Sequence, residues 1–231
     1  IINKKKINKI NKILQSLESK KPADLPPNIF FGKKKNQSEA YISNILEADK
    51  EFEKLAAIPK ILKIMAHLTS NFFRLNHTVA MTKFKKNTYT DLHMGNLPHH
   101  PKIFYFVKNA KIFSNVTKVL FPIYNNTEKD GGFAVIPGSH KSNFKRPYNN
   151  NPKNNKLLNF IDAKPGDAII FTEALAHGSM INKTNNIRRI ITYCYSVGYM
   201  PDWTKLNLNH SKEYFNKAPN KIKKLIKTYK G

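Results

Sequence analysis

Apolar side chains recur at helical spacing through the first 70 residues. Ile7, Ile10 and Leu14 lie three or four positions apart among lysines, and residues 39–55 and 58–68 repeat this period. Such spacing is typical of helices that bury one face. The proline-rich stretch 22–27 breaks the pattern and predicts a loop. We therefore expect residues 1–70 to be helical, with one loop between the helices.

From residue 71 onward, the pattern changes to short runs of β-branched and aromatic residues, which is typical of strands. Glycine, proline and asparagine separate the runs, as in the turn sequences Asp-Gly-Gly at 130–132 and Pro-Gly-Ser at 137–139. Many short strands at regular intervals predict a sandwich or barrel, and a jelly roll is one standard solution. The expected strands are 72–84, 103–107, 116–124, 133–136, 168–171 and 189–197.

Helical spacing returns after residue 199, and the Asn- and Lys-rich stretch 149–156 predicts a surface loop. A chain of 231 residues fits one domain with a sizeable core. We expect a mainly β chain with flanking helices, in which the core is a double-stranded β-helix or jelly roll. The parts are a helical segment at 1–70, the core at 71–199, and a tail at 200–231 with helices at 211–215 and 222–229.

The formal net charge of +25 is a feature that many nucleic-acid-binding proteins share. Only four of the forty basic residues are arginine, although arginine is better suited to bidentate phosphate and base contacts. Lysine is instead crowded together with asparagine and isoleucine, a combination that AT-rich codons produce without selection for binding. We expect no specific nucleic-acid partner, only weak and salt-sensitive adhesion to polyanions.

No apolar run approaches the roughly eighteen residues that a membrane span needs. Lysines interrupt residues 1–13, which therefore do not resemble the apolar core of a signal peptide. Cys194 is the only cysteine, so no internal disulfide can form, and in an expected strand it reads as a buried structural thiol. These features predict no membrane span and a reducing, cytoplasmic location.

Two histidines and an arginine carry the candidate chemistry. His93 begins the tripeptide His-Met-Gly, His177 follows well downstream, and Arg188 lies eleven residues after His177. Non-haem Fe(II) oxygenases hold their metal with two histidines and one carboxylate, and they leave open positions for cosubstrate and O2. In a histidine-x-carboxylate pair beginning at His93, the carboxylate position is occupied by Gly95.

Four sequence blocks carry a resemblance to a known family. They are Leu-His-Met-Gly (92–95), Asp-Gly-Gly-Phe-Ala-Val-Ile-Pro-Gly-Ser-His-Lys (130–141), Lys-Pro-Gly-Asp-Ala-Ile-Ile-Phe (164–171), and His-Gly-Ser with Arg-Arg (177–179, 188–189). In order and separation these blocks resemble the phytanoyl-CoA dioxygenase family of Fe(II)- and 2-oxoglutarate-dependent oxygenases, and the second block is the most specific. The resemblance extends over about half the chain, and it implies a double-stranded β-helix with a metal near one mouth.

The resemblance also implies that His93 and His177 bind iron. Imidazole is a good ligand for Fe(II), and two strands of a rigid roll can fix both rings. His140 lies in the most specific block, where we expect it to serve turn structure. His99 and His100 stand in a proline-flanked loop and are expected to be exposed.

Arg188 matches the family's arginine that pairs with the distal carboxylate of 2-oxoglutarate, since a planar guanidinium can bind both carboxylate oxygens. Ser179 lies two residues after His177, shares its face of a strand, and offers a hydroxyl to the cosubstrate. Because a turn-rich segment separates His177 from Arg188, we expect the two on adjacent antiparallel strands. Alternation sends Arg189 to the opposite face, where we expect it to meet solvent.

Gly95 departs from the family pattern, and three explanations stay open. Another carboxylate completes the metal site: Glu173 lies four residues before His177, on the same face if the strand is extended, and Asp91 and Asp130 are alternatives that also suit capping or turn roles. The second explanation is that a halide fills the position, as in related iron halogenases that carry a small residue there. The third is that iron binds weakly or not at all, and that the protein is a degenerate relative.

The combined interpretation is an Fe(II)- and 2-oxoglutarate-dependent dioxygenase, with His93, His177 and Glu173 at the metal and Arg188 and Ser179 at the cosubstrate. We expect it to hydroxylate an unactivated C–H bond of a small molecule and to consume O2. The alternatives are a halogenase with chloride at the site opened by Gly95, and a non-catalytic relative that binds polyanions.

Overall fold

A six-stranded sheet is the largest element of the computed structural model, which describes residues 1–26, 28–33, 38–93, 102–142, 149–153, 155–201 and 210–227. Every neighbouring pair of its strands is antiparallel. From edge to edge the strands are β1 (Phe30–Lys33), β2 (Glu39–Ser43), β3 (Phe73–Lys83), β11 (Arg188–Val197), β6 (Val116–Pro122) and β9 (Ile169–Thr172). The two longest strands, β3 and β11, pair at its centre.

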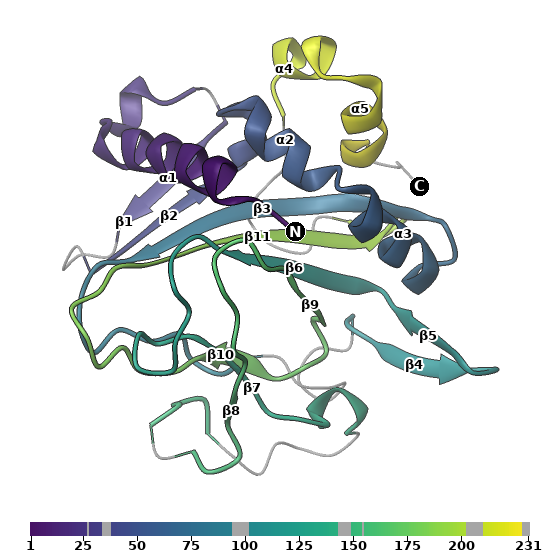
Figure 1. Cartoon of the computed structure of the whole chain (residues 1–231). Coiled ribbons are helices and arrows are strands. Elements are labelled where there is room, and N and C mark those ends of the chain that lie inside the picture. The colour runs from purple at the N-terminus through teal and green to yellow at the C-terminus, as the bar shows by residue number, and fades with distance from the viewer. Residues whose placement is uncertain are drawn as a thin grey trace.

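A smaller sheet lies opposite the large one, below it in Figure 1, and consists of β10 (His177–Ser179), β7 (Phe133–Val135) and β8 (Asn159–Phe160). Apolar side chains of both sheets, among them Leu120, Phe133 and Ile190, pack together between them. A separate hairpin of β4 (Tyr105–Lys108) and β5 (Lys111–Ser114) projects at one side (Figure 1). Two facing antiparallel sheets form a jelly-roll arrangement that is not a closed barrel, so the predicted fold class is confirmed.

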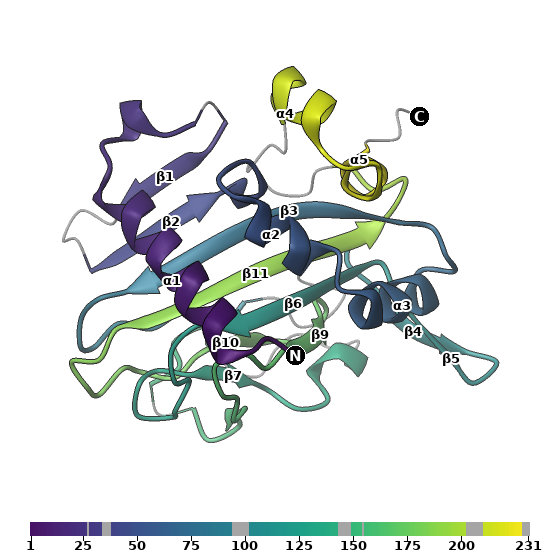
Figure 2. The same cartoon turned by 45° about the horizontal axis from the view of Figure 1, so that its top comes forward.

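The α-helices lie on the outer side of the large sheet, and α1 crosses several of its strands (Figures 1 and 2). The α-helices are α1 (Lys4–Ser19), α2 (Lys50–Ala56), α3 (Pro59–Leu68), α4 (Lys212–Lys217) and α5 (Asn220–Ile226), and the short 3-10 helices are η1 (Pro22–Asp24), η2 (Ile45–Glu47) and η3 (Ser139–Lys141). Helix and sheet side chains such as Leu14, Phe52 and Tyr193 form the main core between these layers. Within the described ranges, no helix has the length and apolar character that a bilayer crossing requires.

The helices expected at 58–68 and in the tail are present as α3, α4 and α5. The expectation of helices throughout residues 1–70 is wrong for residues 30–33, which form β1, and for residues 39–43, which form β2. Ala40 and Ile42 lie on one face of this strand and Glu39 and Tyr41 on the other, which is a period of two. Five residues are too few to distinguish this period reliably from helical spacing.

Alternation along β11 sends its side chains into two environments. The hydroxyls of Tyr193 and Tyr195 donate hydrogen bonds to backbone carbonyls of α2. Arg189 points to the same side, and the expectation that it meets solvent is wrong. Its side chain is buried and forms an ion pair with Glu18 of α1, because α1 covers this end of the sheet. Arg188 faces the interior between the two sheets.

Arg189→Met should lower the free energy of unfolding by about 3–5 kcal/mol, because it leaves the Glu18 carboxylate without its partner at a largely buried position. Urea denaturation followed by circular dichroism measures the change. Lys217→Met is the control, since Lys217 pairs with Glu213 on the exposed surface and should leave stability almost unchanged. Equal effects of the two substitutions would contradict a structural role for the buried pair.

Candidate metal centre

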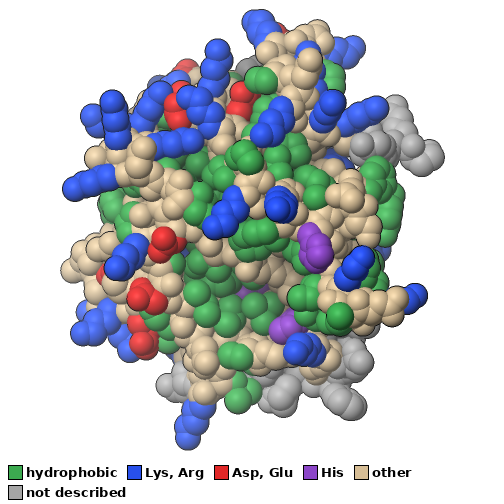
Figure 3. Space-filling model, turned by 45° about the vertical axis from the view of Figure 1, so that its right-hand side comes forward, with side chains coloured by type: hydrophobic (Ala, Val, Ile, Leu, Met, Phe, Trp, Pro, Cys, Tyr) green, Lys and Arg blue, Asp and Glu red, His purple; other side chains and the backbone are tan. Residues whose placement is uncertain are grey.

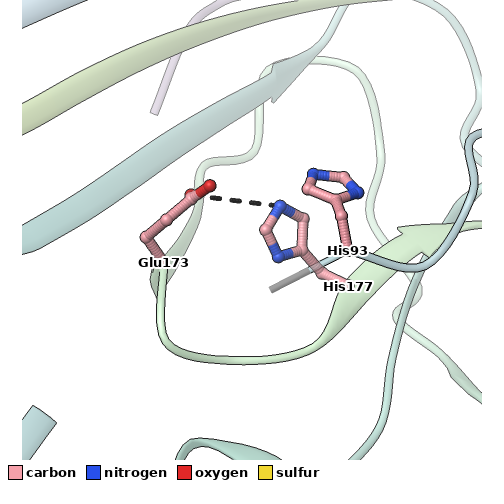
Figure 4. A group of neighbouring side chains, drawn as sticks. All are labelled: His93, Glu173 and His177. Carbon is pink, nitrogen blue, oxygen red and sulfur yellow. Dashed lines mark ion pairs between the residues drawn. The ribbon is translucent and has the colours of Figure 1, made fainter. Parts of the chain in front are cut away.

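Three side chains that could hold a metal ion come together at one end of the interior. The candidate ligand atoms of His93, Glu173 and His177 all lie within 4.8 Å of one another. The two imidazole rings have centroids 4.1 Å apart, and the carboxylate of Glu173 points toward His177, with 4.0 Å between Oε2 and Nε2 (Figure 4). The structure thus joins both predicted histidines to one of the three candidate carboxylates.

Backbone pairing holds the two histidines side by side. His93 and His177 exchange two backbone hydrogen bonds of 3.0 and 3.1 Å in an isolated antiparallel bridge. Gly178 permits this close approach, because a Cβ atom there would lie 2.7 Å from the carbonyl oxygen of Thr90. A larger residue at position 178 would therefore push the segment that carries His93 away from β10.

Each imidazole has its Nδ1 atom tied to a carbonyl oxygen of its own chain segment. The distances are 2.8 Å from His93 Nδ1 to the oxygen of Asp91, and 2.7 Å from His177 Nδ1 to that of Leu175. A carbonyl oxygen can only accept, so Nδ1 carries the proton and, in a neutral ring, Nε2 keeps its lone pair. This arrangement is usual for histidines that bind metals through Nε2.

Burial keeps the imidazole of His177 neutral. It lowers the pKa of His177 well below its ordinary value, and the nearby His93 and the positive charge of Lys118 lower it further, whereas the hydrogen bond to the Leu175 carbonyl opposes the shift. A neutral imidazole is the form that binds a metal cation. His177 therefore needs to lose no proton when a metal arrives near neutral pH.

Glu173 forms an ion pair with Lys118 of β6. The ammonium Nζ lies 2.8 Å from each carboxylate oxygen, and the geometry of a hydrogen bond is met at Oε1. Oε2, which faces His177, accepts no hydrogen bond from the described residues. The carboxylate is thus shared between a lysine on one side and the histidine pair on the other.

The other candidate carboxylates and histidines lie elsewhere. Asp130 accepts hydrogen bonds from the side chains of Thr127, Thr184 and Asn186, which suits a structural role in its turn. The side chain of Asp91 is exposed. His140 lies in η3 and packs edge-on against Tyr105, apart from the cluster. The remaining sequence candidates, Gly95, His99 and His100, lie outside the described residues.

Arg188 and Lys83 place two buried cations side by side farther along the interior, directly opposite each other on β11 and β3. Lys83 Nζ donates to Thr90 Oγ1 at 2.8 Å and to Ser179 Oγ at 3.4 Å, and lies 3.8 Å from the carboxylate of Glu39. Sequence reasoning missed Lys83. Its position becomes informative only once the register of β3 against β11 is known.

The guanidinium of Arg188 has an unmet hydrogen-bonding requirement. Its Nε is buried and has no hydrogen-bond partner within the described part of the chain. Burial lowers the pKa of Arg188 to about 10, and the nearby Glu39 opposes that shift. The side chain stays cationic near neutral pH, and a buried orphan donor of this kind suits an anionic ligand.

The expectation that His177 and Arg188 lie on adjacent strands is wrong. β10 pairs with β7 in the small sheet, whereas β11 pairs with β3 and β6 in the large one. The turn-rich segment between them crosses from one sheet to the other, and Asn182 forms a bridge with Asp130 on the way. The two side chains therefore approach the interior from opposite sheets, and the contact of Lys83 with Ser179 links those sheets.

Several solved enzymes share this fold. HygX from Streptomyces hygroscopicus, with nickel and 2-oxoglutarate bound, has a TM-score of 0.73 and 19% identity over 88% of this chain and 83% of that one. EctD from S. alaskensis, with 2-oxoglutarate and 5-hydroxyectoine, has a TM-score of 0.66 and 19% identity over 86% and 70%. SnoN, an epimerase from nogalamycin biosynthesis, has a TM-score of 0.62 and 13% identity over 91% and 84%. No curated protein sequence matches the chain.

The family model of phytanoyl-CoA dioxygenase (PhyH) matches residues 2–190, and the chain belongs to this family. The class is that of iron- and 2-oxoglutarate-dependent enzymes, as the sequence resemblance implied. The residues present fit both cofactors. Two imidazoles and a carboxylate are a donor set for Fe(II), and the buried, unpaired Nε of Arg188 suits a carboxylate of 2-oxoglutarate.

His77 of β3 belongs to the same interior. It lies opposite Cys194 of β11, which in turn lies opposite Lys118 of β6. Burial, together with the positive charge of Lys118, lowers the pKa of His77 to about 3. The folded protein therefore keeps this imidazole uncharged through the weakly acidic range.

Stability should consequently fall as the pH is lowered from about 6.5 toward 3, because the unfolded chain protonates His77 and the folded chain does not. The slope from this group is at most about 1.4 kcal/mol per pH unit. His77→Gln should flatten the pH dependence measured by urea denaturation between pH 7.5 and 4.5. The exposed His67, substituted in the same way, should leave the slope unchanged. A slope that is identical in wild type and His77→Gln would show that the burial of His77 does not set it.

Proposed function

We propose that this chain is an Fe(II)- and 2-oxoglutarate-dependent oxygenase that hydroxylates an unactivated C–H bond of a small molecule. His93, His177 and Glu173 hold the iron, and Arg188 binds the distal carboxylate of 2-oxoglutarate beside Ser179. The observation that carries the proposal is the pair of neighbouring imidazoles, each with Nδ1 held by a backbone carbonyl, beside a buried carboxylate. Iron supplies the radical chemistry by which 2-oxoglutarate and O2 become succinate and CO2 while one oxygen atom enters the C–H bond.

The charges in the interior support the binding of a dicarboxylate. Lys83 lies near Glu39, so the two charges largely offset each other, whereas Arg188 has no carboxylate within salt-bridge distance among the described residues. One carboxylate of 2-oxoglutarate pairs with the Arg188 guanidinium, which its planar fork can hold by two parallel hydrogen bonds. Burial of this pair excludes water and strengthens the interaction.

The position of Glu173 favours hydroxylation over halogenation. A halide would take a ligand position that no carboxylate fills, and Glu173 already brings a carboxylate to the two histidines. Turnover should therefore be indifferent to the chloride concentration.

The structural neighbours support a small molecule as the substrate. HygX has been crystallised with hygromycin B, EctD with 5-hydroxyectoine, and SnoN with nogalamycin RO. These ligands differ widely in chemistry, but each is a small molecule. We accordingly propose a small-molecule substrate for this chain as well.

The rival function is polyanion binding through the lysine-rich surface. On the face seen in Figure 3, lysine and arginine side chains are scattered among apolar and uncharged ones and form no continuous basic patch. Nucleic-acid sites usually gather their basic residues on one face or along one helix. The face in Figure 3 therefore gives no support for the polyanion-binding alternative.

Arg188→Met should weaken 2-oxoglutarate binding at least 100-fold, since it removes two charge-assisted hydrogen bonds, and it should abolish Fe(II)-dependent succinate formation. Arg188→Lys keeps the positive charge but loses the planar guanidinium. Its affinity for 2-oxoglutarate should lie between those of Arg188→Met and wild type. The measurement is anaerobic calorimetric titration with 2-oxoglutarate, followed by succinate analysis in air. Wild-type affinity in Arg188→Met would assign the cosubstrate to other residues.

Glu173→Gln should lower Fe(II) affinity at least tenfold and remove most turnover, because an anionic ligand becomes a neutral amide. Adding Gly95→Asp in that background should recover part of both, since it returns a carboxylate where the family resemblance places one. In the wild-type background, Gly95→Asp should crowd the metal and lower activity. Unchanged iron affinity in Glu173→Gln would remove Glu173 from the metal site and reopen the halide alternative.

A further inference from the structure

We infer that Lys118 is a positioning residue that competes with the metal for Glu173, so that iron binds tightly only together with 2-oxoglutarate. The inference rests on the proposed function, because it concerns the same site. Its basis is a feature that oxygenase chemistry does not require, namely an ammonium group in direct contact with the carboxylate of the candidate metal centre.

The sheet register directs Lys118 into the metal centre. Lys118 lies opposite Cys194 on one side and Phe171 on the other, and Glu173 follows Phe171 by two positions. The side chain of Lys118 is 13% exposed and that of Glu173 only 1%, so water screens the pair poorly. The positive charge of Lys118 also lowers the pKa of His177 in the metal centre and that of the nearby His77.

The contact with Lys118 leaves Glu173 too far from His177 for an octahedral site. Two ligand atoms that occupy neighbouring positions, each about 2.1 Å from a metal, lie about 3.0 Å apart. The separation between Glu173 Oε2 and His177 Nε2 is 4.0 Å. The carboxylate therefore has to move toward the histidine by about 1 Å, and that movement loosens its contact with the ammonium.

Charge balance points the same way. Two imidazoles and a carboxylate already paired with an ammonium offer a dication no net negative charge. A bound 2-oxoglutarate brings two negative charges, one of which is available near the metal when the other is on Arg188. Affinity for iron and affinity for 2-oxoglutarate should then rise together, because the coupling between two ligands is reciprocal.

The test is anaerobic titration of the full chain with Fe(II), with and without saturating 2-oxoglutarate, in wild type, Lys118→Met and Lys118→Arg. Lys118→Met removes the charge and keeps most of the side-chain volume; Lys118→Arg keeps the charge. Lys111→Met, in the exposed strand β5, is the matched control for loss of one lysine. Thermal unfolding of each variant shows that it is folded before titration.

We expect Lys118→Met to bind Fe(II) alone at least tenfold more tightly than wild type, and the enhancement by 2-oxoglutarate to shrink by a similar factor. Lys118→Arg and Lys111→Met should behave like wild type. Suppose that the wild type binds Fe(II) in the presence of 2-oxoglutarate, but that Lys118→Met binds Fe(II) alone no more tightly than the wild type does. This inference is then overturned, and the proposed function stands. If neither protein binds Fe(II) even with 2-oxoglutarate, the proposed function fails, and the inference fails with it.

Discussion

Strict alternation of side chains along β11 is the constraint on which both halves of the molecule depend. One set of its residues, with Arg189, Tyr193 and Tyr195, anchors the helices to the outer face of the large sheet. The other set, with Arg188 and Cys194, faces the interior between the sheets. A shift of one residue in the pairing with β3 would exchange the two sets. The stability of the helical layer and the position of the cosubstrate arginine are thus fixed by the same register.

The interior is divided by its electrostatics into two regions. At one, Lys83 and Arg188 are held close together, with Glu39 offsetting part of their charge. At the other, two histidines stand beside a carboxylate that is already paired with Lys118. Neither region is satisfied on its own, since Arg188 Nε and Glu173 Oε2 are buried without hydrogen bonds from the described residues. A dianionic cosubstrate would provide an acceptor for Arg188 Nε, and a divalent cation would provide a partner for Glu173 Oε2.

Much of the fold follows from the sequence because strands and helices of sufficient length have distinct hydrophobic periods. The segments that became β3, β6 and β11 were long enough to recognise, whereas β2 was too short to distinguish from a helix. Alternation predicts that Arg188 and Arg189 face opposite sides of the sheet, but it does not predict what covers each side, so it does not reveal that Arg189 is buried. That information lies in the packing of α1 against the sheet.

The candidate site was predictable in its residue types and less so in its geometry. The family resemblance points to His93, His177 and Arg188, and the spacing from His177 suggests Glu173. The expectation that Glu173 and His177 share one extended strand is wrong, because the chain turns between β9 and β10. Lys83 and Lys118 carried no sequence signal, because a lysine in this lysine-rich chain becomes notable only when strand register buries it.

Our main proposal is that His93, His177 and Glu173 together form the iron site. A crystal structure of the chain prepared without oxygen, with Fe(II) and 2-oxoglutarate, tests it most directly through the anomalous scattering of the metal. We expect one anomalous peak about 2.0–2.2 Å from Nε2 of both histidines and from a carboxylate oxygen of Glu173, with the distal carboxylate of 2-oxoglutarate on Arg188. A metal held by other residues, or a Glu173 with neither carboxylate oxygen bonded to the metal, would contradict this assignment.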